Sequence, residues 1–292
     1  MRSTTLRRLA PFVGLALVIL VFAFLTGAPA QYLSMPNLRI VLAQTVIVAI
    51  GAVGMTMIIV SGGIDLSVGS TIALTSVAAA LALHRSWPPV AAVTASIVLG
   101  GLVGAVNGLV ITRLRVVPFI ATLGMLGVAR GGAKWLAGEM TVPAPETWIN
   151  ELAVTFPSRA WMVVAPGVWL ALMLAMAASF ALRRTVFGRH VFAIGSNEVA
   201  ALACGIAVAR MKVAIYCLAG CAFGLAGVMQ MSRLRQGDPT VAAGLELDII
   251  AAVVIGGGSL SGGQGGILGA MIGALIMAFL RNGCQQMGWP NY

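Results

Sequence analysis

The sequence predicts an all-α integral membrane protein, a polytopic bundle of transmembrane helices. Of its 292 residues, 60% are hydrophobic and only 9% are charged. A soluble domain carries about a quarter charged residues, so these few charges cannot cover the surface of a water-soluble globule. The apolar residues also form runs near the roughly 20 residues that a helix needs to cross a bilayer. We expect a single transmembrane domain over residues 1–292.

Nine apolar runs are candidate spans, separated by gaps that hold glycine, proline or charged residues. The first run follows Arg2, Arg7 and Arg8 and resembles a signal peptide. Its length and the apolar character of the remaining chain favour a retained helix. The nine runs cover 9–25, 40–60, 68–83, 90–111, 119–137, 161–182, 211–231, 245–255 and 267–280.

The distribution of basic residues predicts the orientation in the membrane. The net charge is +10, and basic clusters fall at residues 1–8, at Arg113 and Arg115, and within 183–212. Basic loops stay in the cytoplasm, so we expect a short cytoplasmic N-terminus (1–8) and a cytoplasmic segment at about 183–210. Arginines at 39, 85, 159, 233 and 235 depart from this rule. The charge does not indicate nucleic-acid binding, because the basic residues form no exposed face with interleaved aromatics.

A weak internal repeat relates two parts of the chain. The short runs 68–83 and 245–255 adjoin glycine-rich turns, and each precedes a helix with glycines four apart, at 99–105 and 268–274. Interrupted segments at matching places in two halves point to a transport pathway. Alternatively, such glycines only let helices pack closely.

Asp65 is an unusual carboxylate between two apolar spans, in the motif Ser-Gly-Gly-Ile-Asp-Leu-Ser at 61–67. A carboxylate at that place is costly unless it is paired or hydrated. It belongs either to a pathway or gate, or to a helix cap in which Asp65 or Ser67 accepts the first backbone N–H groups of the next helix. The cap is the favoured interpretation. Arg130 and Lys134, one helical turn apart, either extend their charges toward water or contact a hydroxyl-rich solute.

Residues 188–206, between two basic clusters, are too polar to cross a membrane. Ser196 or Asn197 is positioned to cap a short helix over Glu198–Ala203, and Gly205 is positioned to end it. Such a helix, held between two spans, suits docking to a soluble partner. It equally suits a loop helix that lies on the membrane surface.

No catalytic site is predicted. The string Leu-Ser-Gly-Gly-Gln at 260–264 is the signature of ABC-type ATPases, but the phosphate loop that such an ATPase needs is missing, since only Lys134 and Lys212 occur and neither follows glycine. We therefore interpret 256–266 as a glycine-rich chain reversal. No zinc motif, nucleophile elbow or paired carboxylate site is present in the sequence, so no metal or cofactor is expected in this chain.

Several long motifs, in order, resemble those of ribose-type ABC sugar importer permeases, a family of monosaccharide transporter membrane subunits. The resemblance begins near Leu38 and covers nearly all of the following chain. The matching stretches are 55–70, Asn-Gly-Leu at 107–109, Pro-Phe-Ile-Ala-Thr-Leu-Gly at 118–124, Ala-Ile-Gly-Ser-Asn at 193–197 with Ala200, Ala201, Gly205 and Ile206, and 245–263.

The resemblance implies a permease of about ten spans in the bacterial inner membrane, where nine are seen here. It implies a homodimer or heterodimer of permeases, a cytoplasmic ABC ATPase that hydrolyses the ATP, and a periplasmic binding protein that delivers a monosaccharide. It also implies that 195–205 is the ATPase-coupling helix. The candidate coupling residues are Gly195, Asn197, Glu198, Ala200 and Gly205; the candidate pathway or gate residues are Asp65, Asn107, Phe119 and Arg130.

Two alternatives stay open. A branched-chain amino-acid importer permease has a related architecture, although the Gly-Gly-Ile-Asp-Leu-Ser motif favours the sugar group. A self-contained secondary transporter needs several ionisable residues within its spans, and this chain has few beyond Asp65, Arg130 and Lys134.

Overall fold

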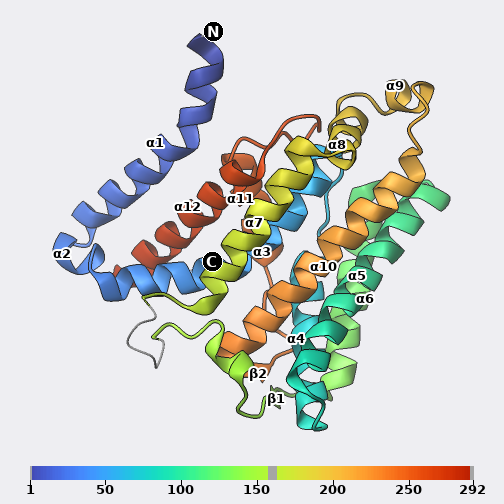
Figure 1. Cartoon of the computed structure of the whole chain (residues 1–292). Coiled ribbons are helices and arrows are strands. Elements are labelled where there is room, and N and C mark those ends of the chain that lie inside the picture. Colours follow the sequence, from blue (N-terminus) through green and yellow to red (C-terminus); the bar gives the residue numbers. More distant parts are fainter. Residues whose placement is uncertain (1, 157–162, 290–292) are drawn as a thin grey trace.

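The computed structural model describes residues 2–156 and 163–289, and this part of the chain is a bundle of helices (Figure 1). Two short strands, β1 (Val142–Pro143) and β2 (Gln236–Gly237), pair antiparallel at one end. A 3-10 helix, η1 (Trp148–Glu151), lies in the loop after the sixth helix. The helices are α1 (Arg2–Leu25), α2 (Pro29–Tyr32), α3 (Met35–Val60), α4 (Val68–His84), α5 (Pro89–Arg113), α6 (Pro118–Ala137), α7 (Pro166–Arg184), α8 (Val186–Ser196), α9 (Glu198–Ala203), α10 (Val208–Leu234), α11 (Leu245–Ile255) and α12 (Ile267–Gln286).

The predicted all-α membrane protein is confirmed. Five helices, α3, α5, α7, α10 and α12, are long and apolar enough to cross a bilayer, and α4 and the 9–25 part of α1 are apolar but shorter. The count of nine spans stays a prediction. The predicted start of one span at 161 lies outside the described residues, and the helix there begins at Pro166.

Local signals explain where the helices begin and end. Proline occupies the first turn of α3, α5, α6 and α7, where its missing N–H costs no hydrogen bond and its fixed φ suits the helix. Ser34 caps α3 by accepting the backbone N–H of Asn37 at 3.4 Å. Gly138 ends α6 in the left-handed conformation, with φ of 60°.

The centre of the bundle is α3, which is buried over nearly its whole length by α10, α12, α11 and α7. The closest helix pair is α10 with α5. Gly100 and Gly104 of α5 face Gly220 of α10 so closely that a Cβ on any of them would strike the opposite backbone. Helices in membranes associate through such small residues because lipid gives them no hydrophobic driving force.

The second glycine pair of the proposed repeat packs in the same way. Gly269 and Gly273 of α12 lie against the backbone of Gly256 and Ala252 around the end of α11. Close packing therefore accounts for both glycine-spaced helices, and the repeat itself stays a prediction.

Helix α1 lies at the edge of the bundle and packs mainly on α12 (Figure 1). Phe22 covers Gly283 of α12, and the Tyr32 hydroxyl donates to the carbonyl oxygen of Phe279 at 3.0 Å. The start of α1 and the α8–α9 segment lie at one end of the bundle, whereas α2, β1 and β2 lie at the other (Figure 1).

Candidate functional site

Helix α9 forms where the sequence predicts it. The side-chain oxygen of Asn197 accepts the backbone N–H of Ala200 at 3.0 Å. This bond is an N-cap, which satisfies one of the free donors of the first turn. At the other end, Gly205 has φ of +81° and its N–H donates to Leu202, while Ile206 donates to Ala201. These are the bonds of a helix that ends on a left-handed glycine.

The preceding helix α8 was not predicted. Residues 183–210 contain the end of α7, two helices at a sharp junction and the start of α10. Thr185 caps α8 by accepting from Gly188 N–H at 3.3 Å. Val191 and Ile194 are buried, so α8 has one face in the bundle.

Gly195, near the end of α8, meets two other segments without an intervening side chain. A Cβ on Gly195 would strike the carbonyl group of Val60, at the end of α3, and the backbone nitrogen of Gly263. The N–H of Gly263 also donates to the Val60 carbonyl oxygen at 2.9 Å. Residues 256–266 form the predicted glycine-rich reversal, with positive φ at Gly262 and Gly263. The reversal, the end of α3 and α8 thus form one three-way backbone junction.

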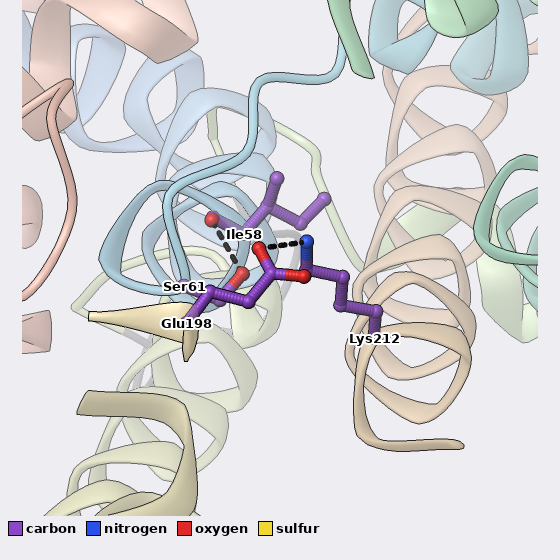
Figure 2. A network of polar contacts seen from close by, with 4 residues as sticks. All are labelled: Ile58, Ser61, Glu198 and Lys212. Atoms are coloured by element: carbon purple, nitrogen blue, oxygen red, sulfur yellow. Dashed lines mark hydrogen bonds and ion pairs between the residues drawn. The ribbon is translucent and has the colours of Figure 1, made fainter. Parts of the chain in front are cut away.

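An ion pair connects α9 to α10. The Lys212 ammonium lies 2.6 Å from the Glu198 carboxylate, and the Glu198 side chain is 47% exposed. Figure 2 shows this pair in one view with Ser61, whose hydroxyl donates to the Ile58 carbonyl oxygen at the end of α3. An exposed pair of this kind contributes only about 0–1 kcal/mol, so it orients α9 more than it stabilises the fold.

The outer face of α9 is apolar and unoccupied by other described residues. Val199 is 77% exposed and Leu202 is 55% exposed. Leu202 and Glu198 also border a hollow of about 500 Å³ whose opposite wall is the turn between α5 and α6. A small exposed apolar helix beside a hollow has the shape of a docking element for another protein.

Asp65 and Asn107 meet in a buried polar cluster. One Asp65 carboxylate oxygen accepts the Ser67 N–H at 2.8 Å and the Ser67 hydroxyl at 2.6 Å. The Asn107 amide donates to the other carboxylate oxygen at 3.2 Å and to the Ser67 hydroxyl oxygen at 3.0 Å. The cap interpretation is wrong: Asp65 closes the turn before α4 by binding the N–H of Ser67, the N-cap residue itself, and neither side chain accepts an N–H from the first turn of α4.

Two further residues hold the same turn and were missed by the sequence analysis. The Leu66 N–H donates to the Thr122 hydroxyl oxygen at 3.1 Å, and the Tyr216 hydroxyl donates to the Ile64 carbonyl oxygen at 3.4 Å. The sequence offered one indication that Thr122 has a role, namely its place in the 118–124 motif. Nothing in the local sequence distinguishes Tyr216 from a core aromatic residue.

Phe119 and Arg130 lie apart from this cluster. Phe119 is 48% exposed on the surface of α6. Arg130, further along α6, donates from one guanidinium nitrogen, Nη1, to the carbonyl oxygens of Pro239 at 2.9 Å and Val241 at 2.6 Å. The structure therefore brings together two of the four candidate pathway residues.

The segment that Arg130 holds, residues 238–244, enters the bundle as non-helical chain, and we call it the re-entrant segment. Gly237 packs against Val77 on α4, and Ala242 packs against Gly69 on the same helix. Eight residues of helix separate Val77 from Gly69, which corresponds to a descent of about 12 Å. Exposed peptide groups at such depth are tolerated only where protein or water satisfies them, and the Arg130 guanidinium does this for two carbonyls.

Helix α11 starts where the re-entrant segment ends. It has 11 residues, about 16 Å of helix, which is half of the roughly 30 Å hydrocarbon core. It is therefore a half-helix that begins inside the bundle, the kind of element that lines solute sites in transporters.

Comparison with known proteins relates this chain to membrane permeases. Residues 37–292 match the family model described as the permease component of the branched-chain amino acid transport system. The ribose import permease protein RbsC of Escherichia coli (strain K12) is 40% identical over 278 residues, 95% of this chain and 86% of that protein. RbsC of Bacillus subtilis (strain 168) is 40% identical over 289 residues, 98% of this chain and 88% of that protein.

A third relative is the fructose import permease protein FrcC of Rhizobium meliloti, 33% identical over 95% of this chain and 78% of that protein. No solved structure matches the chain. The matches extend over residues 183–210, the Asp65 motif and the re-entrant segment together, since each covers nearly the whole chain. The chain belongs to this permease family and, within it, to the ribose-type permeases of ABC sugar importers.

Proposed function

We propose that this chain is the membrane-spanning subunit of an ABC importer that moves a monosaccharide, a ribose-like pentose or a hexose, across the inner membrane by alternating access. The observation that carries the proposal is the 40% identity to ribose import permeases over 95% of the chain. The ATP is hydrolysed by a separate cytoplasmic ABC ATPase, and a periplasmic sugar-binding protein delivers the solute. Two permease subunits, identical or different, complete the pathway.

The α8–α9 end of the bundle faces the cytoplasm in this proposal, together with the start of α1. The basic residues at 183–184, 189, 210 and 212 favour that side. Val199 and Leu202 are the apolar contacts that α9 offers to the ATPase. Asn197, Ala200 and Gly205 hold the helix in shape, and Glu198 orients it through Lys212.

Gly195 gives the route by which a displacement of α9 reaches the pathway. The three-way backbone junction connects α8 to the end of α3. The turn that Asp65 and Asn107 hold follows directly after α3 in the chain. We therefore assign Asp65 and Asn107 to a cytoplasmic gate, in which they keep the turn rigid while α3 moves.

The test is co-purification followed by transport. The chain is expressed with the ATPase and binding protein encoded beside it, reconstituted in proteoliposomes, and assayed for uptake of a panel of monosaccharides and branched-chain amino acids. We expect sugar-stimulated ATP hydrolysis and sugar uptake. Uptake of branched-chain amino acids without sugars, or uptake without any ATPase, contradicts the proposal.

A matched pair of variants tests the docking face. Leu202→Glu places a charge on α9, whereas Leu33→Glu places the same charge on an equally exposed leucine (57%) at the opposite end of the bundle. We expect Leu202→Glu to lose the ATPase during purification and Leu33→Glu to keep it. Equal retention of the ATPase by both variants rules out α9 as the docking element.

A further inference from the structure

A polar cavity lies inside the bundle, away from the Asp65 cluster and the coupling segment. It has a volume of about 230 Å³ and lies between α3, α10, α11, α12 and the end of the re-entrant segment. Pockets for drug-sized ligands measure about 300–1,000 Å³, so this cavity suits a smaller solute. Six polar side chains line it, together with apolar groups such as Ile47 and Met277; the polar ones are Gln44, Gln230, Arg233, Asp248, Arg281 and Gln285.

The inner part of the cavity holds buried polar groups. Gln230 is only 4% exposed, and its amide makes no hydrogen bond to any other residue that the structure describes. Asp248 is 13% exposed and forms an ion pair with Arg281. These side chains border the cavity, where water or a solute with hydroxyl groups can form hydrogen bonds with them.

The mouth of the cavity faces away from α8 and α9. Arg281 and Gln285 are exposed residues on the last turns of α12, and Arg233 is an exposed residue on the last turn of α10. These helix ends lie on the side of the bundle that carries α2, β1 and β2 (Figure 1). In the proposed orientation this is the side from which a binding protein delivers its solute.

The polar groups of the lining suit a solute that carries several hydroxyl groups. Asp248 and Arg281 form an ion pair, and Arg233 adds a positive charge at the mouth of the cavity. A carboxylate accepts hydrogen bonds, a guanidinium donates them and an amide does both. Adjacent hydroxyl groups, each a donor and an acceptor, match this set without separating the ion pair.

We propose that this cavity is the site at which a monosaccharide binds on its way through the permease, held by Asp248, Gln230 and Arg281. The proposal rests on the sugar-importer function and names a site for it. The start of α11, at Leu245, also borders the cavity, and half-helices of this kind supply solute sites in transporters.

Cysteine protection tests occupancy of the site. Gln44→Cys and Ala243→Cys, both on the cavity, are made in a chain whose four native cysteines are replaced by alanine; Gln31→Cys, exposed on α2, is the control. Each variant is assembled with its ATPase and binding protein and treated with a small hydrophilic thiol reagent, with and without the sugar that the wild-type complex imports.

We expect the sugar to slow modification at both cavity cysteines and not at Gln31→Cys. At a sugar concentration about ten times its Kd, simple occupancy slows the reaction about tenfold. Absence of protection, or absence of modification at both cavity positions, overturns the proposal. If the wild-type complex imports no sugar at all, the proposed function fails first, so the two failures are distinguishable.

A charge exchange separates solute binding from a structural link between α11 and α12. Asp248→Asn should lower uptake roughly tenfold or more, because a hydrogen bond to a charged group is lost. Glu146→Gln, on a side chain that is 92% exposed, is the control. The double variant Asp248→Arg with Arg281→Asp restores an ion pair but exchanges donor and acceptor, so uptake should stay low. Recovery of uptake in the double variant, with the complex intact, overturns the proposal.

Discussion

Replacing Arg130 by leucine removes both hydrogen bonds that hold the carbonyl groups of the re-entrant segment. One guanidinium nitrogen donates to Pro239 and Val241, residues more than a hundred positions away in the sequence. The leucine fills part of the same volume and donates nothing. Two carbonyl oxygens then lie inside the bundle without the donor that satisfied them.

The magnitude follows from the two bonds that are lost. Hydrogen bonds between helices in membrane proteins contribute about 0.6 kcal/mol on average and about 1.7 kcal/mol at most. Two of them give a loss of about 1–3 kcal/mol. Since 1.4 kcal/mol is a factor of ten in an equilibrium constant, the re-entrant segment should open roughly five- to 140-fold more often.

Unfolding in a denaturing detergent measures the stability, and the labelling rate of Val241→Cys, at a partly buried position of the re-entrant segment, measures the local opening. Lys134 provides the matched control, because it lies one turn further along α6, is exposed, and its side chain makes no hydrogen bond or ion pair to any residue in the described part of the chain. Lys134→Leu should stay within about 0.5 kcal/mol of the wild type, as surface substitutions usually do.

The reasoning is refuted if Arg130→Leu and Lys134→Leu unfold alike and label alike. That result would mean that water or the lipid headgroups already satisfy the carbonyls of Pro239 and Val241. A loss of stability without faster labelling would show instead that Arg130 stabilises α6 and not the re-entrant segment.

Two further predictions concern the other polar and backbone contacts. Gly195→Ala should destabilise the protein by about 1–3 kcal/mol, as overpacking does, because the added methyl group meets the Val60 carbonyl; thermal unfolding in mild detergent checks this, and an unchanged Tm contradicts the close contact. Asn107→Leu should cost about 1–3 kcal/mol, because the buried Asp65 loses a donor; a variant as stable as the wild type would place water in that cluster.

The sequence predicted most where the signals are local. The predicted first and last residues of α9 match the structure. Both signals are local, because Asn197 caps the helix and Gly205 ends it directly beside it in the chain. Helix α8 was missed because its own sequence contains Gly188 and Gly195, which lower helix propensity. Those glycines are there for tertiary contacts, with Leu182 and with Val60, which no local pattern reveals.

The candidate site shows the same division. The sequence predicted a local bond of Asp65 or Ser67 to the next helix, whereas Asp65 binds the Ser67 N–H, two residues away, and the Asn107 amide, 42 residues away. Arg130 was expected to extend toward water or to contact a solute, whereas its hydrogen-bond partners are carbonyl oxygens of a distant segment. The cavity was missed for this reason too, since its polar residues come from four helices and none is conspicuous alone.

The position of α1 has a consequence for biosynthesis. Phe22 of α1 and Gly283 of α12, which are in contact, are 261 positions apart, and ribosomes add about 5–20 residues per second. The N-terminal helix therefore spends roughly 10–50 s in the bilayer before α12 exists to receive it. During that interval α12 cannot retain it in lipid, so the run of apolar residues at 9–25 must be sufficient for insertion without that helix.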